Sequence, residues 1–148
     1  MTETTTGTFH GPYEISADPA RIDAARVHHW ISTDTYWGVG RPREKQDRAI
    51  AGSLNFGAYH RDTGEIAAYA RVVTDGATFA WLCDVYVDRP ARGAGLGTAL
   101  VDAALDHLEE TYGLRRMLLS TADAHGVYEK VGFRPLENPD KWMALGHQ

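Results

Sequence analysis

An apolar run that feeds a glycine-rich turn constrains the fold of this chain more than any other feature. Residues 79–87 have the composition of a buried strand, the turn 92–98 follows, and a helical pattern begins near Leu96. This order leaves backbone N–H groups free at the positive end of a helix dipole. Glycines at alternate positions let the backbone approach a ligand without interference from Cβ atoms. The sequence therefore predicts a site for a phosphate or a pyrophosphate.

The glycine spacing narrows the choice of ligand. No Lys follows any glycine, which excludes the phosphate loop of nucleoside triphosphatases. Gly93, Gly95 and Gly97 read G-x-G-x-G rather than the G-x-G-x-x-G of dinucleotide-binding folds. What remains is Arg92-x-x-Gly95-x-Gly97. The alternative interpretation is a glycine-rich turn ahead of an ordinary helix.

A second informative segment, residues 124–133, reads Ala-His-Gly-Val-Tyr-Glu-Lys-Val-Gly-Phe. Its apolar residues fall at helical spacing on one face, which predicts a short helix. Gly132 is typical of a helix C-cap, and we expect Phe133 to pack back against the helix. Taken alone, Tyr128 is better explained as a core residue.

Together the two segments resemble the GNAT superfamily of N-acetyltransferases. The first resembles its acyl-CoA pyrophosphate motif, R/Q-x-x-G-x-G/A, and the second resembles its late helix, A-x-x-x-Y-E-K-x-G-F. The resemblance covers roughly residues 13–145. It implies an α/β fold with a mixed, mostly antiparallel central sheet of about six or seven strands and about four flanking helices.

Hydrophobic periodicity and turn residues place the elements of this fold. Strands are expected at 13–16, 54–60, 66–74, 77–87, 114–120, 133–136 and 142–145, and helices at 18–31, 42–53 and 96–111 and around Tyr128. Asp75-Gly76 predicts a two-residue hairpin turn. We expect one domain, residues 13–148, after a disordered tail, residues 1–12.

Composition excludes several classes of protein. A net charge of −5 with scattered Lys and Arg argues against a nucleic-acid partner. No apolar run approaches the ~20 residues of a membrane span, so no membrane partner is expected. The seven histidines are dispersed, so no metal site is predicted. The single cysteine, Cys83, is expected to be buried and inert, which fits a reducing cytoplasm.

The resemblance implies which residues hold acetyl-CoA, here as the acyl-donor substrate. The strand before the glycine loop pairs its free backbone with the pantetheine arm, and the loop binds the pyrophosphate. The implied residues are Val85, Tyr86, Val87, Arg92, Gly93, Ala94, Gly95, Gly97 and Thr98. Arg92 either meets a phosphate or caps the turn. Thr121 stands where the family often has an asparagine that contacts pantetheine.

Catalytic roles are predicted for Tyr128 and Asp84. Tyr128 resembles the family tyrosine beside the CoA sulfur, and a phenol with a pKa of about 10 can protonate the departing thiolate. Asp84 is the only charge in residues 79–87, and a tight hairpin would leave it without a cation, since Arg71 would lie too far along the strand. It is therefore a candidate base. Two alternatives remain open. Tyr69 or a backbone amide satisfies Asp84 in a purely structural role, or Glu44 is the base.

Tyr36 and Trp37 occupy a loop bounded by glycines and Pro42. They are candidates for the acceptor pocket, where aromatic rings wall a cavity or contact a cationic amine, and the alternative is that they pack the loop onto the sheet. The sequence thus predicts a cytoplasmic acetyltransferase that moves the acetyl group of acetyl-CoA directly to a primary amine of a small molecule, as a monomer or homodimer. A non-catalytic acyl-CoA sensor, a nucleotide-binding module and acetylation of a protein amine are the alternatives.

Overall fold

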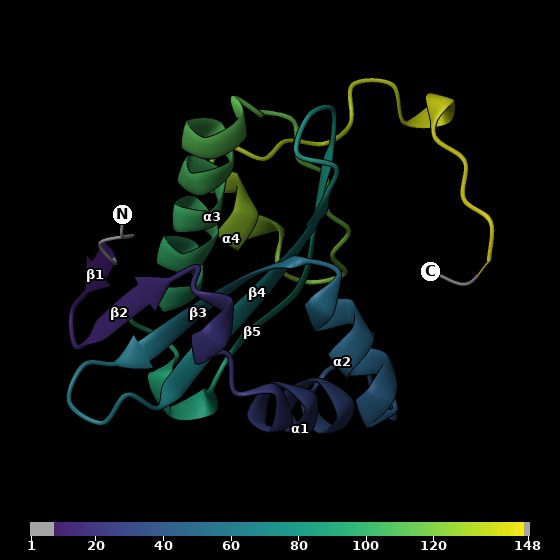
Figure 1. Ribbon diagram of the computed structural model, residues 1–148. Coiled ribbons are helices and arrows are strands. Elements are labelled where there is room, and N and C mark those ends of the chain that lie inside the picture. The colour runs from purple at the N-terminus through teal and green to yellow at the C-terminus, as the bar shows by residue number, and fades with distance from the viewer. Residues whose placement is uncertain (1–7, 147–148) are drawn as a thin grey trace.

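A computed structural model describes residues 8–146 and contains one five-stranded antiparallel sheet (Figure 1). The strands lie side by side in the order in which they occur along the chain. They are β1 (Thr8–His10), β2 (Tyr13–Ser16), β3 (Leu54–His60), β4 (Ile66–Thr74) and β5 (Ala80–Val87). β5 is therefore an edge strand, and it leads directly to the glycine loop.

Helices cover both faces of the sheet (Figure 1). One face packs against α3, and the other packs against α1, with α2 beside α1. The helices are α1 (Ala24–Asp34), α2 (Arg43–Ala51), α3 (Leu96–Tyr112) and the single-turn α4 (His125–Glu129). Within the described residues, no helix is both long and apolar enough to cross a membrane.

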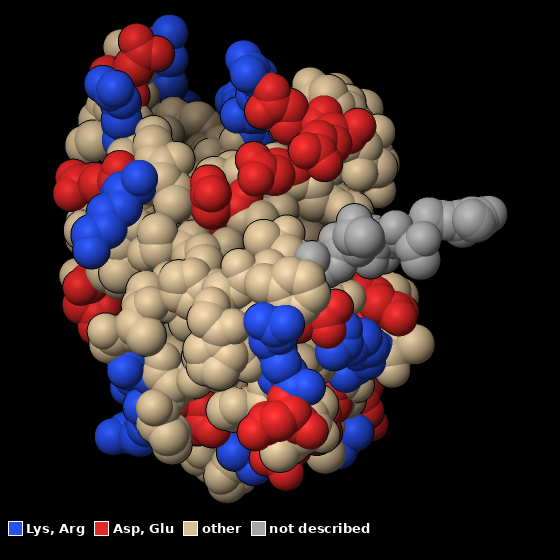
Figure 2. All heavy atoms as spheres, turned by 90° about the vertical axis from the view of Figure 1, so that its left-hand side faces the viewer, with Lys and Arg blue, Asp and Glu red and all other residues tan. Residues whose placement is uncertain are grey.

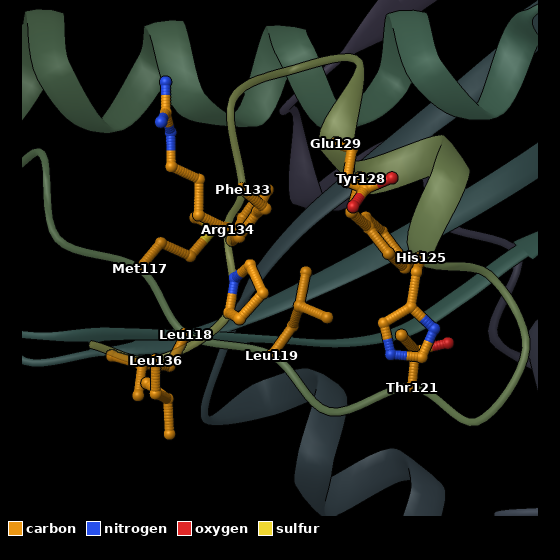
Figure 3. A pocket seen from close by; sticks show the side chains of 11 residues that line it. Met117, Leu118, Leu119, Thr121, His125, Tyr128, Glu129, Phe133, Arg134 and Leu136 are labelled. Carbon is orange, nitrogen blue, oxygen red and sulfur yellow. The ribbon is translucent and has the colours of Figure 1, made fainter. Parts of the chain in front are cut away.

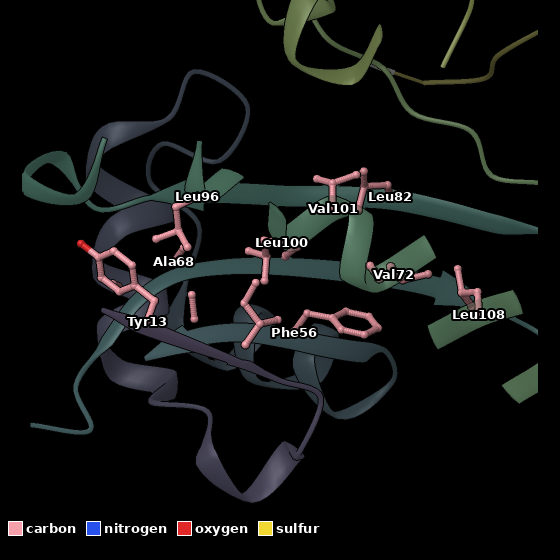
Figure 4. Packing of buried hydrophobic residues seen from close by; sticks show 14 of the residues in the cluster. Tyr13, Phe56, Ala68, Val72, Leu82, Leu96, Leu100, Val101 and Leu108 are labelled. Carbon is pink, nitrogen blue, oxygen red and sulfur yellow. The ribbon is translucent and has the colours of Figure 1, made fainter. Parts of the chain in front are cut away.

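Alternation along the strands separates two hydrophobic clusters. The larger cluster lies under α3, whose apolar residues recur at helical spacing, and Figure 4 shows Leu100 of α3 close to Phe56 of β3. The smaller cluster holds Trp30 and Ile31 of α1 against tyrosines of the sheet. Both clusters position the two ends of β5, because this strand contributes Leu82 to the first and Tyr86 to the second.

The exposed face of α3 is acidic. Figure 2 shows a row of acidic side chains on this side of the molecule, with basic side chains next to one end of it. Arg115 is one basic partner of the row, since it pairs with Glu109 over 2.7 Å. The acids on α3 are Asp102, Asp106, Glu109 and Glu110. Desolvation and the neighbouring carboxylates raise the pKa of Asp106.

Several predicted elements are confirmed, and three predicted strands are not. The strands 13–16, 54–60 and 66–74 have the predicted bounds. The disordered tail predicted for residues 1–12 is wrong for residues 8–10, which form β1; residues 1–7 lie outside the described part of the chain. The helix expected at 18–31 is divided into a 3-10 turn, Pro19–Arg21, and α1. Asp23 is the N-cap of α1, and its side chain accepts a hydrogen bond from the Arg26 amide.

Five strands replace the six or seven expected, and the difference lies after α3. The segment 114–120 contributes a single parallel bridge, Trp81 to Leu118, rather than a full strand. Residues 133–136 and 142–145 form no strand, and Pro135 lacks the amide that a ladder needs. Met143 and Leu145 are 97% and 103% exposed, and the segment extends away from the sheet (Figure 1).

The hairpin between β4 and β5 also differs from the prediction. Its loop is residues 75–79, because Thr74 pairs with Ala80. The Asp75 carboxylate accepts hydrogen bonds from the amides of Ala77, Thr78 and Phe79, which stabilises the longer loop. The register of β5 against β4 therefore shifts from that of a two-residue hairpin, with consequences for the site described below.

Candidate functional site

The glycine loop forms an uncapped helix N-terminus. Gly93 and Gly95 have φ of +89° and +76°, a left-handed conformation that favours glycine. Gly95 is the N-cap of α3, and no side chain among the described residues caps this helix. His10 of β1 fixes the loop from the opposite side, since its Nε2 donates to the Ala94 carbonyl over 2.7 Å. The first amides of α3, including that of Thr98, are left for an anionic ligand.

Arg92 makes contacts of the capping kind, one of the two roles predicted for it. Its Nε donates to the Val87 carbonyl over 2.8 Å, and its Nη2 lies 3.5 Å from the Asp34 carboxylate of α1. The guanidinium also lies over the Tyr86 ring, 5.1 Å from the centroid. In this conformation Arg92 ties the start of the glycine loop to β5 and α1.

The outer edge of β5 opens toward the glycine loop. The bonds Leu82 N–H to Leu118 C=O and Leu118 N–H to Ala80 C=O join the start of β5 to the segment after α3. Within residues 8–146 this bridge is the last pairing on that edge, so the two segments diverge beyond it. Val85 and Val87 lie along the open part. A slot between diverging strands can hold an extended ligand through backbone hydrogen bonds.

A cavity of about 460 Å³ lies where these segments diverge. Its walls come from the loop after α1, from β4 and β5, and from the segment before α4. Both predicted aromatics line it: the Tyr36 hydroxyl accepts the Ala122 amide over 2.9 Å, and the Trp37 indole donates to Asp84 over 3.0 Å. These contacts join the aromatic loop to β5 on one side of the cavity and to the segment before α4 on the other.

Gly38 allows the aromatic loop to take this position. A Cβ atom there would lie 2.4 Å from Cγ2 of Ile31, which is fully buried in α1. The Gly38 amide donates to the Thr35 hydroxyl, which in turn donates to the Ile31 carbonyl. The loop is therefore anchored on the end of α1, and this anchor presents Tyr36 and Trp37 to the cavity.

Asp84 is held by two arginines at the base of the cavity. Its Oδ2 accepts hydrogen bonds from Arg41 Nη1 at 2.7 Å and Arg71 Nε at 3.0 Å. The prediction that no cation neutralises Asp84 is wrong. The reason is the shifted hairpin register, which pairs Arg71 with Cys83, and an irregularity after Tyr69, where Asp84 adopts φ of +51°.

This environment makes Asp84 a poor base. Burial raises the pKa of Asp84, but the hydrogen bond from Arg41 and the charge of Arg71 outweigh it, so the net pKa is lowered. A carboxylate with a lowered pKa binds a proton weakly at neutral pH. Glu44, the alternative base, is exposed on α2 and is absent from the cavity lining among the described residues.

Tyr128 lies where the cavity meets a second one. It lines both the 460 Å³ cavity and a more apolar cavity of about 260 Å³, where Figure 3 shows it beside His125 on α4. Burial raises the pKa of Tyr128, and Tyr36 and Asp123 add to the shift. The phenol therefore keeps its proton at neutral pH. Phe133 packs edge-on against its ring at 5.9 Å, as predicted.

Thr121 and Cys83 also reach the cavities. Thr121 lines both of them, and its hydroxyl accepts the Ala124 amide over 3.1 Å, which orders the turn before α4. Cys83 is half-buried and lines the larger cavity, so it is more accessible than expected. Burial raises the pKa of its thiol to about 11, so it stays protonated at neutral pH.

Sequence reasoning missed Arg41 and Arg71 as residues of the site. Arg71 is the only charged residue of β4 and Asp84 is the only one of β5. Single opposite charges in two adjacent apolar strands indicate an ion pair between the strands. The register of a two-residue hairpin, which the sequence suggested, placed these two residues too far apart to pair. No group of three or more His, Cys, Asp or Glu side chains suited to a metal occurs within residues 8–146.

An open-edged strand, an uncapped glycine loop and a tyrosine on the following helix define an acyltransferase-type site. The chain also matches the model of the acetyltransferase (GNAT) family over residues 24–133. It therefore belongs to the GNAT family of acetyltransferases.

Individual relatives agree with this assignment. The protein is 40% identical to a GNAT-family protein (xcc2953) of Xanthomonas campestris pv. campestris, with a TM-score of 0.84 over 91% of this chain and 93% of that one. It is 28% identical to "Putative acetyltransferase FG08082" of Gibberella zeae, over 81% of this chain and 77% of the relative. It shares its fold with glucosamine-6-phosphate N-acetyltransferase of Arabidopsis thaliana, at 19% identity, a TM-score of 0.64, and coverage of 92% and 97%.

Proposed function

We propose that this protein transfers the acetyl group of acetyl-CoA directly to a primary amine of a small molecule. The observation that carries the proposal is the uncapped N-terminus of α3, which follows an open strand edge beside a cavity that contains Tyr128. The residues present fit the donor: the amides from Gly93 to Thr98 suit its pyrophosphate, and the edge from Val85 to Val87 suits its pantetheine arm.

Tyr128 supplies a proton to the CoA thiolate as the acetyl group leaves. Its raised pKa keeps the phenol protonated, so it can donate without a second group to prepare it. An amide near Val85 polarises the thioester carbonyl, and backbone donors of this kind contribute strongly to acyl transfer. Direct attack by the amine is favoured because the raised pKa of Cys83 leaves no reactive thiolate for an acyl-enzyme route.

Asp84 does not take the amine proton directly in this scheme, because two arginines stabilise its ionised form. The amine reaches the thioester as the neutral species, and after the attack its nitrogen releases one proton to water in the cavity. Water then returns a proton to the Tyr128 phenolate, so the phenol is restored when the CoA thiol leaves. Asp84 acts as a positioning residue, since it fixes Trp37 and both arginines at the cavity base.

A non-catalytic acyl-CoA-binding function is the second candidate, and the neutralised Asp84 favours it, since a carboxylate paired with two arginines is a poor base. The acceptors of two structural neighbours differ, so they do not select the acceptor of this protein. One acts on glucosamine 6-phosphate, and another, from Escherichia coli, on the alanine of ribosomal protein S18. A small-molecule acceptor is proposed because the aromatic loop covers a cavity of limited volume.

Substitution of Tyr128 separates the two functions. We expect Tyr128→Phe to reduce acetyl-CoA-dependent turnover of an amine by about 10²-fold, because the proton donor is lost while the ring remains. Affinity for acetyl-CoA should change less than about threefold. The measurements are thiol release across a panel of primary amines and calorimetric titration with acetyl-CoA.

Tyr112→Phe is the matched control, because Tyr112 lies exposed at the end of α3 and lines neither cavity. It should leave both measurements unchanged. A wild-type protein that binds acetyl-CoA and acetylates no amine in the panel would support the binding function instead. Full turnover by Tyr128→Phe would remove Tyr128 from the mechanism.

A further inference from the structure

The arginine cluster at the base of the larger cavity holds more positive than negative charge. The Asp84 side chain is 1% exposed, and those of Arg41 and Arg71 are 16% and 14% exposed. Both guanidiniums donate to the same Oδ2, while Oδ1 accepts the neutral indole N–H of Trp37. Two positive groups thus share one negative group in a mostly buried place. Buried charges are normally paired, so this excess favours an additional anion.

Both guanidiniums keep donors that such an anion can use. Nη1 of Arg41 donates hydrogen bonds to Asp84 and Gln46. In Arg71, Nε donates to Asp84 and Nη1 donates to Ser53. Within residues 8–146, Nη2 of neither arginine makes a hydrogen bond, and both arginines line the cavity. Two guanidiniums with free donors match the geometry of a carboxylate or a phosphate.

Other charges around the cavity do not cancel this excess at its base. The remaining acid in the lining is Asp123, which is exposed in the turn before α4. Aromatic side chains of the loop after α1 also line the cavity, where the rings of Tyr36 and Trp37 stand edge to face with their centroids 5.1 Å apart. The cavity is therefore divided between a cationic base, an aromatic wall and the end that contains Tyr128.

We propose that the acceptor amine also carries an anionic group, a carboxylate or a phosphate, which Arg41 and Arg71 bind. The anion would rest on the arginines while the amine reaches the thioester beside Val85 and Tyr128, which line the same cavity. This inference rests on the proposed acetyltransferase function and specifies the class of its acceptor.

The test uses pairs of amines that differ by the anion alone. γ-Aminobutyrate is compared with butylamine, and phosphoethanolamine with ethanolamine, by calorimetric titration into wild-type protein saturated with CoA and by thiol release from acetyl-CoA. At least one anionic member should bind about tenfold or more tightly than its partner. The carboxylate and phosphate arms show which anion the site prefers.

Variants change the charge of the cluster in both directions. Arg71→Gln should weaken binding of the preferred anionic amine about tenfold, whereas Asp84→Asn should tighten it about threefold, because the competing carboxylate is gone. A cluster that serves only to hold the loop predicts a loss in both variants. Asp47→Asn, at an exposed aspartate–arginine pair on α2 outside this cavity, is the matched control and should leave the affinity unchanged.

Each outcome separates this inference from the proposed function. Two results would overturn the inference alone, in a protein that binds acetyl-CoA. One is equal affinity for the amines with and without the anionic group, and the other is no binding of any anionic amine at millimolar concentration. Weakened binding by Asp84→Asn in a folded protein would also overturn it. Failure to bind acetyl-CoA would overturn the proposed function, and the inference with it.

Discussion

Two carboxylates in this protein are each contacted by two arginines and one aromatic donor, in very different surroundings. The partners of Asp84 are Arg41, Arg71 and Trp37, and those of Asp34 are Arg89, Arg92 and Tyr86. The Asp84 side chain is 1% exposed at the base of the cavity, and the Asp34 side chain is 27% exposed at the end of α1. In both cases the arginines lower the pKa of the carboxyl.

The comparison shows that burial, rather than the set of partners, decides what such a cluster does. Around Asp34, water screens the charges, and the Arg89 side chain is 70% exposed. The cluster there connects α1 to the residues before the glycine loop and contributes little to the free energy of unfolding. Around Asp84, the charges are desolvated, so loss of one partner leaves the others uncompensated.

The largest predicted effect is on the stability of the fold. Asp84→Ala should lower the free energy of unfolding by about 3–5 kcal/mol, because it leaves two buried guanidiniums without their carboxylate. Asp34→Ala should have a much smaller effect. Urea unfolding of both variants measures the difference. Equal losses would show that burial does not distinguish the clusters.

A smaller effect is expected on acidification. The pKa of Asp84 is lowered in the folded state, so its contribution to stability is complete above the unfolded pKa of about 4 and is lost as pH falls through the folded pKa. Asp84→Asn should therefore flatten the fall in stability below about pH 4 relative to wild type. Urea midpoints recorded over this range test it, and parallel profiles for wild type and variant would contradict it.

The smallest effect is on salt sensitivity. Raising the salt to about 1 M should shrink the stability difference between wild type and Asp34→Ala, because exposed pairs are screened. The difference between wild type and Asp84→Ala should persist. Unfolding curves at low and high salt provide the comparison. A salt-sensitive Asp84 contribution would mean that solvent reaches this cluster more freely than its exposure indicates.

The parts of the fold that depend on local pattern were predictable from sequence. β3 and β4 have the predicted bounds, and α3 begins at the predicted Leu96. The sheet order beyond β5 was not predictable, because a strand depends on a partner that periodicity does not reveal. Residues 133–136 have a suitable apolar content, but Pro135 interrupts the donors and no neighbouring edge pairs with them.

Much of the candidate site was also predictable, but its electrostatics were not. Tyr36, Trp37, Asp84 and Tyr128 come together around one cavity. Arg71 was missed as a partner of Asp84 because Asp75 caps a five-residue loop, which moves Arg71 within reach. A shift of register is invisible to composition, yet here it converts a candidate base into a structural anion.

The most direct test of the central claim is a calorimetric titration of the wild-type protein with acetyl-CoA, with ATP and NAD titrated in parallel. The uncapped glycine loop beside an open strand edge predicts micromolar binding of acetyl-CoA and no comparable binding of ATP or NAD. Equal or tighter binding of ATP or NAD, or no binding of acetyl-CoA, would contradict the assignment of the loop and of Tyr128 together.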